Sequence, residues 1–298
     1  MKKISLYIVS IMMLSNLMFA GIQIKGSDTM DSLVKRLADV YMKGHRGSNI
    51  LVSGGGNNNG IISLTNGKTN IANSSRLIGS KEIEKMKAKG KDPRGIVIAV
   101  YGLCLVVNAD NPISNLSMDT IAMIFSGEIK NWKQIGGSDT PITLYGRQIS
   151  TSAYPFFREH VLKEKDYSES MTMLNGHSDI IYAVKQDPSA IGYVGIDYVM
   201  NDSKLLNNIK IINVSAHSGE PSFNPLDDKN IYNGNYPMAQ GLLQYVNGMP
   251  KVEVLNFIKW ELSPEGQKIV MEEGFYEAKG VFVVDNEKAF IKTKKFVK

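Results

Sequence analysis

The stretch SGGGNNNG, residues 53–60, combines four glycines with three asparagines and contains no hydrophobic residue. The apolar runs Ile50-Leu51-Val52 before it and Ile61-Ile62 after it predict a strand that enters the stretch and a helix that leaves it. Glycine permits positive φ and close approach of the backbone to a ligand, while asparagine tolerates such turns and caps helices. The stretch is therefore either a flexible surface loop or a cradle of backbone N–H groups for an anion.

Three other polar loops occur in a similar setting. GSDTM (26–30) and GRQISTSAY (146–154) each lie between a strand-like run and a helical pattern, and NSSR (73–76) follows the apolar pair Ile71-Ala72. In an open α/β sheet such loops gather at the carboxyl ends of the strands, where ligands bind. Since all four loops carry hydroxyl, amide or arginine groups, the sequence favours the anion cradle.

Short apolar runs alternate with helical patterns along the chain, which predicts an α/β fold. A helix is expected to start near Thr29, a short helix to cover residues 60–66, and a strand to end at Arg147. The run GIVIAVYGLCLVVN (95–108) is long and apolar with an internal glycine, as if one strand continued into another. Ser117 is expected to cap a helix, and so is Ser263, which Pro264 follows.

The N-terminus has the features of a secretory signal peptide. Lys2 and Lys3 precede an apolar run that ends at Ala20-Gly21. A retained membrane anchor is the alternative, but polar residues interrupt the run, which is short for a spanning helix. We expect residues 1–20 to be removed, with the cleavage site uncertain by a residue or two. Because the single cysteine, Cys104, does not follow the signal, the sequence predicts a soluble periplasmic protein without a disulfide or a lipid anchor.

Composition and motifs disfavour several classes of function. The 298 residues include 43% hydrophobic and 21% charged residues, as in an ordinary globular protein, and the net charge of +5 comes from scattered lysines rather than a nucleic-acid-binding stripe. The glycine stretch lacks the ending of a P-loop and the spacing of a dinucleotide site. GHSDI (176–180) lacks the second glycine of a nucleophile elbow, so Ser178 is expected to cap a helix. Metal-site spacing is absent around the four histidines, His45, His160, His177 and His217.

At its polar loops the chain resembles the periplasmic phosphate-binding proteins of bacterial phosphate ABC transporters. The resemblance covers nearly the whole mature chain and is carried by KGSDTM, SGGGNNNGIISLTNGKTNIANSSR, IAVYGLCLVVNADNPI, IFSGEIKNWKQIGG, YGRQISTSAYPFFREHVL, AIGYVGIDYV, YPMAQGLLQYVNG and LSPEGQKIVMEEGF. It implies a two-domain periplasmic-binding fold in which two crossover strands form a hinge. Domain one would hold residues 21–104 and 233–298, and domain two residues 105–232.

The resemblance also implies which residues bind phosphate. It places them in the four polar loops: Thr29 and the backbone N–H of Met30, Asn57, Ser75, Arg147, and the pair Thr151 and Ser152. Four positions depart from the family's residues. Asn57 stands where a serine is usual, Ser75 where many members have an aspartate that receives a proton from phosphate, and Ala153 where a threonine would donate a hydroxyl. Gln240 also replaces a frequent arginine.

The chemistry of these residue types suits an oxyanion. Arginine donates two parallel bonds from a rigid fork, and a helix N-terminus adds partial positive charge. A surface ion pair is the ordinary role of an arginine such as Arg147, and capping is that of Thr29 and Asn57. Asp28 has two interpretations: its carboxylate accepts the proton of a protonated phosphate and so disfavours sulfate, or it caps the helix at Thr29.

The sequence thus predicts a monomeric binding protein, without cofactor or metal, that captures inorganic phosphate and delivers it to an inner-membrane ABC permease. A binder of another oxyanion, or a phosphate sensor without transport, is the alternative. A periplasmic phosphatase is disfavoured because neither a nucleophile nor a metal cluster is evident. The hinge is expected near residues 101–107 and 228–236, so that closure brings Arg147 toward Thr29 and Asn57.

Overall fold

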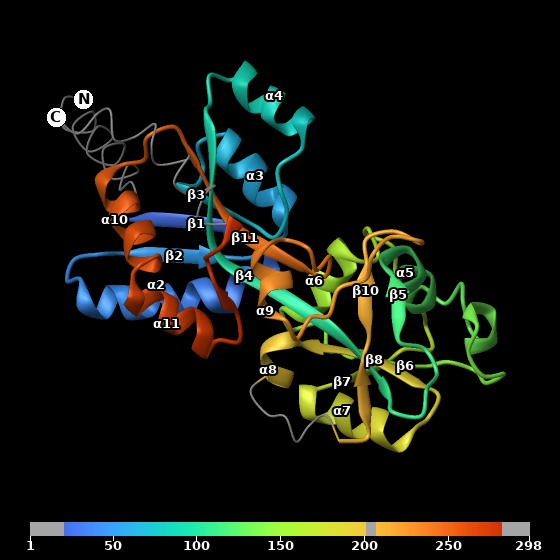
Figure 1. The fold of residues 1–298 in the computed structure, drawn as a ribbon. Coiled ribbons are helices and arrows are strands. Elements are labelled where there is room, and N and C mark those ends of the chain that lie inside the picture. Colours follow the sequence, from blue (N-terminus) through green and yellow to red (C-terminus); the bar gives the residue numbers. More distant parts are fainter. Residues whose placement is uncertain (1–20, 201–206, 282–298) are drawn as a thin grey trace, which may run out of the picture.

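A computed structural model describes residues 21–200 and 207–281, and the predicted signal peptide lies outside them. The described chain forms a mixed α/β structure around a twisted sheet of ten strands (Figure 1). The main path of the sheet runs in the order β2 (Ile50–Ser53), β1 (Ile22–Gly26), β3 (Ile71–Ser74), β11 (Ala239–Asn247), β4 (Pro93–Asn108), β8 (Ala190–Gly195), β6 (Thr143–Arg147) and β7 (Thr172–Leu174).

Four further strands complete the sheet structure. Both β9 (Ile209–Ile211) and β12 (Tyr276–Glu277) pair with β4, while β5 (Asn115–Ser117) and β10 (Asn213–Ser215) form a separate parallel pair. Strands β1, β2 and β3 are parallel to one another, as are β6, β7 and β8. The predicted α/β fold class is confirmed.

Strand β4 joins the two ends of the sheet. Its residues 93–102 pair with β11, whereas residues 103–107 pair with β8. The change of partner falls at Gly102, where an added Cβ would lie 2.6 Å from Cδ1 of Ile196. The long apolar run therefore forms one strand that continues from one part of the molecule into the other, as its internal glycine indicated.

The two ends of the sheet define two lobes. We call the part built on β1, β2, β3, β11 and residues 93–102 the first lobe, and the part built on β6, β7, β8 and residues 103–108 the second lobe (Figure 1). We propose that these lobes are the two predicted domains. The return connection passes Met238, whose carbonyl accepts a hydrogen bond of 3.1 Å from the N–H of Leu103, next to the first crossing.

Helices cover both lobes. Those of the first lobe are α2 (Asp31–Gly44), α3 (Asn57–Thr65), α4 (Ser80–Ala88), α10 (Val252–Glu261) and α11 (Pro264–Glu272). The remaining helices are α5 (Met118–Phe125), α6 (Ala153–His160), α7 (His177–Gln186), α8 (Ile196–Met200) and α9 (Asp228–Tyr232), with short 3₁₀ turns η1 (Asp28–Met30) and η2 (Trp132–Ile135). Leu33 and Leu37 of α2 join the main core, whereas Ile61 and Leu64 of α3 pack in a smaller cluster with Met86.

Most of the expected helix starts are present. Oγ of Ser117 accepts from the N–H of Thr120 at 3.2 Å, and Oγ of Ser263 accepts from Gly266 at 3.3 Å. The expected cap at Ser178 is wrong: α7 begins one residue earlier, and Asp179 instead accepts from the N–H of Gly176 at 2.8 Å. Helix α3 likewise starts at Asn57 rather than at residue 60, because the glycine turn ends sooner than the apolar periodicity indicates.

Candidate functional site

In the stretch 53–60, Ser53 ends β2, residues 54–56 form the turn, and Asn57 begins α3. Gly55 and Gly56 have φ of +110° and +85°, a region that disfavours residues with a Cβ. A Cβ at Gly60 would lie 2.5 Å from the carbonyl oxygen of Lys25, so this glycine lets α3 pack directly on β1. The N–H of Gly55 donates to Oδ1 of Asp28 at 2.7 Å, which fixes the turn against the next loop.

The loop after β1 holds two buried hydroxyls without a partner. Ser27 is 1% exposed and Thr29 is 0% exposed, and neither Oγ of Ser27 nor Oγ1 of Thr29 has a hydrogen-bond partner among the described residues. Buried polar groups are almost always hydrogen-bonded in proteins. The two hydroxyls are therefore exceptions, and they leave two donors in this loop free for a polar ligand.

Asp28 and Met30, from the same loop, are placed differently. The side chain of Asp28 is exposed and accepts the Gly55 N–H, which is a third role beside the two that the sequence suggested. Met30 is buried in the core, and its backbone N–H donates to the carbonyl of Ser27 at 3.2 Å. In this conformation the Met30 N–H is therefore engaged within the turn.

Asn57 and Ser75 lie together and contact the opposite lobe. Oδ1 of Asn57 accepts from the N–H of Ser75 at 3.0 Å, and Nδ2 of Asn57 donates to Oγ of Ser75 at 3.1 Å. Both side chains also donate to Oε2 of Glu159 in α6, at 2.8 Å from Asn57 and 2.6 Å from Ser75. Burial raises the pKa of Glu159, opposed by these two hydrogen bonds. The motifs gave no sign of this carboxylate.

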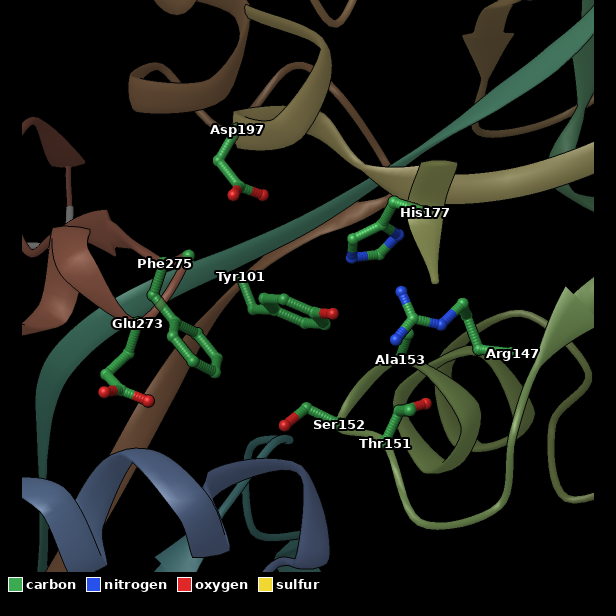
Figure 2. Close-up of a pocket in the computed structure, with 10 residues that line it drawn as sticks. Tyr101, Arg147, Thr151, Ser152, Ala153, His177, Asp197, Glu273 and Phe275 are labelled. Carbon is green, nitrogen blue, oxygen red and sulfur yellow. The ribbon is translucent and has the colours of Figure 1, made fainter. Parts of the chain in front are cut away.

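The predicted residues of the second lobe line a cavity. Arg147, at the end of β6, borders a space of about 150 Å³ together with Thr151 and Ser152 (Figure 2). Nε and Nη1 of Arg147 are buried without a hydrogen-bond partner, and no carboxylate among the described residues forms an ion pair with it. The ordinary surface role of an arginine does not account for this geometry, whereas an anionic ligand would.

The loop between β6 and α6 positions the two hydroxyls beside Arg147. Oγ1 of Thr151 donates to the carbonyl of Gln148 at 2.8 Å, so that hydroxyl is used to shape the turn. Ser152 precedes the first residue of α6, and its Oγ lies 3.4 Å from Oγ of Ser32 in α2. Helix α6 also packs against the η1 turn that contains Thr29. The polar loops of the two lobes therefore meet around α6.

Several residues that the motifs did not single out also line the cavity. They are Tyr101, His177, Asp197, Glu273 and Phe275, with Gly274 between the last two (Figure 2). His177 follows β7 and Asp197 follows β8, so their places at the carboxyl ends of parallel strands were the signal that could have found them.

Burial sets the protonation of these cavity residues. Burial, followed by the charge of Arg147, lowers the pKa of His177 to about 3, so the ring is neutral at physiological pH. The N–H of Gly195 donates to Nδ1 of His177 at 3.4 Å, which leaves the proton on Nε2. Burial raises the pKa of Asp197 to about 6 and also raises that of Tyr101, which stays a neutral hydroxyl.

Two features are absent from the part of the chain that the structure describes. Within residues 21–200 and 207–281, no three or more His, Cys, Asp or Glu side chains are grouped so that they could hold a metal ion. No helix in these two ranges is long and apolar enough to cross a bilayer.

Known proteins resemble the chain over most of its length. The phosphate-binding protein PstS of Pseudomonas aeruginosa is 28% identical over 267 residues, which cover 84% of this chain and 80% of that protein. The crystal structure of PstS from Borrelia burgdorferi matches with a TM-score of 0.68 at 27% identity, covering 87% of this chain and 98% of the other. A possible phosphate-binding protein from Planctomyces limnophilus matches with a TM-score of 0.83 at 22% identity, covering 94% and 99%, which shows the shared fold.

A family model also matches most of the chain. The PBP superfamily domain matches residues 18–265, which is most of the chain and includes all four polar loops. Members of this family are binding proteins, so the prediction of a binding protein rather than an enzyme is confirmed. The chain belongs to the periplasmic-binding-protein superfamily, with a type II fold, and is a substrate-binding protein.

Proposed function

We propose that this protein captures inorganic phosphate between its two lobes and delivers it to the permease of an ABC transporter. The observation that carries the proposal is the set of buried donors without partners: Oγ of Ser27, Oγ1 of Thr29, and Nε and Nη1 of Arg147. These groups lie in loops that meet around α6, and an oxyanion offers acceptors to all of them. Relatives that carry the name phosphate-binding protein support the choice of phosphate.

The proposal extends to where and how the protein acts. An exported location follows from the signal-like residues 1–20 together with the family's relatives, one of which is named an ABC-type phosphate transport receptor. Binding would close the lobes by rotation about the paired strands β4 and β11, whose crossings lie near Gly102 and Met238.

Another oxyanion is the second candidate. Ala153 offers no hydroxyl where the resembling family has one, and Asn57 and Ser75 are engaged with Glu159. Fewer free donors would suit an anion whose oxygens are weaker hydrogen-bond acceptors than those of phosphate.

Titration calorimetry of the mature protein against phosphate, sulfate, arsenate and molybdate distinguishes the candidates. We expect phosphate to bind with a stoichiometry of one and sulfate to bind far more weakly. Tight binding of another anion with no heat from phosphate would refute the choice of phosphate, and silence with all four would refute an oxyanion ligand.

A further inference from the structure

Glu159 contacts the first lobe, although it was not among the residues expected to bind the ligand. Glu159 lies on α6, seven residues after Ser152, so both face the first lobe from the same helix. Its Oε2 accepts from Asn57 and from Ser75, two side chains that the sequence assigned to the anion site.

The contact with Glu159 uses all the side-chain donors of Asn57 and Ser75. The amide of Asn57 has two N–H groups, and one donates to Ser75 while the other donates to Glu159. Ser75 has one O–H, and its 2.6 Å bond to Glu159 is its shortest. While Glu159 stays in place, these two side chains have no donor left for a bound anion.

The negative charge of Glu159 also opposes binding of an anion at Asn57 and Ser75. Glu159 is a half-buried carboxyl group, and its near neighbours include the carboxylates of Asp28 and Glu164 as well as Arg76 of the first lobe. A dianion that approached Asn57 and Ser75 would meet a like charge at the same donors. The carboxylate and the ligand therefore exclude each other there.

We propose that Glu159 is an internal anion that occupies the Asn57 and Ser75 part of the binding site and must be displaced when an oxyanion binds there. Because Glu159 and Ser152 share α6, displacement of the carboxylate moves the helix that also borders the Arg147 cavity. The contact thus lowers affinity and couples ligand entry to a change in how α6 lies on the first lobe. The identity of the competing anion rests on the proposed function, whereas the contact between the lobes does not.

Glu159→Ala tests the competition, and Glu164→Ala is the matched control. Glu164 is exposed and pairs with Arg158 at 2.8 Å, so its loss removes the same charge nearby without touching Asn57 or Ser75. Calorimetry with inorganic phosphate should show binding tightened on the order of tenfold in Glu159→Ala, because the competent state no longer has to be released from the contact. Glu164→Ala should match the unmodified protein. Unchanged or weaker binding in Glu159→Ala would overturn the proposal.

Glu159→Gln and a scattering measurement without ligand test the proposal independently of the alanine variant. Glu159→Gln keeps an acceptor oxygen but loses the charge, so it should tighten binding less than the alanine variant. If the alanine variant does not fold, unchanged or weaker binding in Glu159→Gln overturns the proposal. Small-angle X-ray scattering without ligand should show a larger radius of gyration in Glu159→Ala than in the control. An equal radius would refute the contact between lobes, even if the unmodified protein bound no phosphate and the proposed function failed.

Discussion

The two lobes contribute opposite kinds of surface to the binding site. In the second lobe, Nε and Nη1 of Arg147 are buried beside a cavity and have no partner. In the first lobe, the donors of Asn57 and Ser75 are fully used, and a carboxylate from the other lobe uses them. The comparison teaches that matching residues in one family's loops need not be equally available. The donors of Arg147 are free, and so are the hydroxyls of Ser27 and Thr29 in the first lobe, whereas those of Asn57 and Ser75 are already used.

The largest effect is expected from Arg147, whose guanidinium has two free donors beside the cavity. Arg147→Ala should weaken phosphate binding on the order of a hundredfold, since each charge-assisted hydrogen bond contributes roughly 1.5–3 kcal/mol. Arg147→Lys should restore only part of the affinity because lysine lacks the fork. Calorimetry measures both, with circular dichroism to show that the fold is intact. Equal affinity in the alanine variant would remove Arg147 from the site.

Thr29→Val tests whether the free hydroxyl of the first lobe binds the ligand. Thr29→Val keeps the shape but removes the hydroxyl that lacks a partner, so phosphate binding should weaken by about tenfold. The free energy of unfolding should stay the same or rise slightly, because no internal hydrogen bond is lost and an unsatisfied buried group is removed. A loss of stability with unchanged binding would show that the hydroxyl is structural.

Asp197, which lines the cavity, is expected to make the stability of the folded protein depend on pH. Its pKa is raised in the folded state to about 6 by burial, so its contribution to stability is present below the unfolded value and is lost as pH rises through about 6. Asp197→Asn keeps an acceptor for the backbone N–H groups. We expect its melting temperature at pH 8 to exceed that of the unmodified protein by roughly 2–4 °C, the change that about 1 kcal/mol brings. Calorimetric scans should show the gap closing by pH 5, and a gap independent of pH would contradict this assignment.

The smallest effect is expected from Asp28. Asp28→Asn should narrow the preference for phosphate over sulfate, mainly by admitting sulfate, if the carboxylate faces the ligand. Because Asp28 is exposed and bonded to Gly55, the change should be only about a few-fold. Competition calorimetry with both anions measures it. An unchanged ratio would leave Asp28 with the task of holding the glycine turn.

The fold was predictable because its signals are local. Periodicity located α2 and β6, and serine caps located the starts of α5 and α11. The start of α3 was misplaced by three residues, because Gly56 at positive φ lets the helix begin early, and the cap of α7 was misplaced by two residues.

The site was predictable only in part. Arg147, Thr151 and Ser152 line the cavity as neighbours in one loop, which a motif can reveal. Glu159 contacts residues 84 and 102 positions away, and a glutamate within FREH has the sequence signature of a solvent-facing helix residue. Its partners depend on how one lobe lies against the other, which no local pattern encodes.

We infer that strand β4, which pairs with β11 and then with β8, also limits how the two lobes can move. A flexible linker would let the two lobes separate in any direction. Here the hydrogen-bonded strands β4 and β11 join them and resist separation. Rotation of one lobe relative to the other is the remaining motion, and a small change of twist at Gly102 would displace the distant loops of each lobe by more than it displaces the strand itself. Because a Cβ there would meet Ile196 at 2.6 Å and Ala239 at 3.3 Å, the pivot has little slack for a larger residue. We therefore infer that the separation of the two lobes is set at Gly102, directly after Tyr101, which lines the cavity beside Arg147.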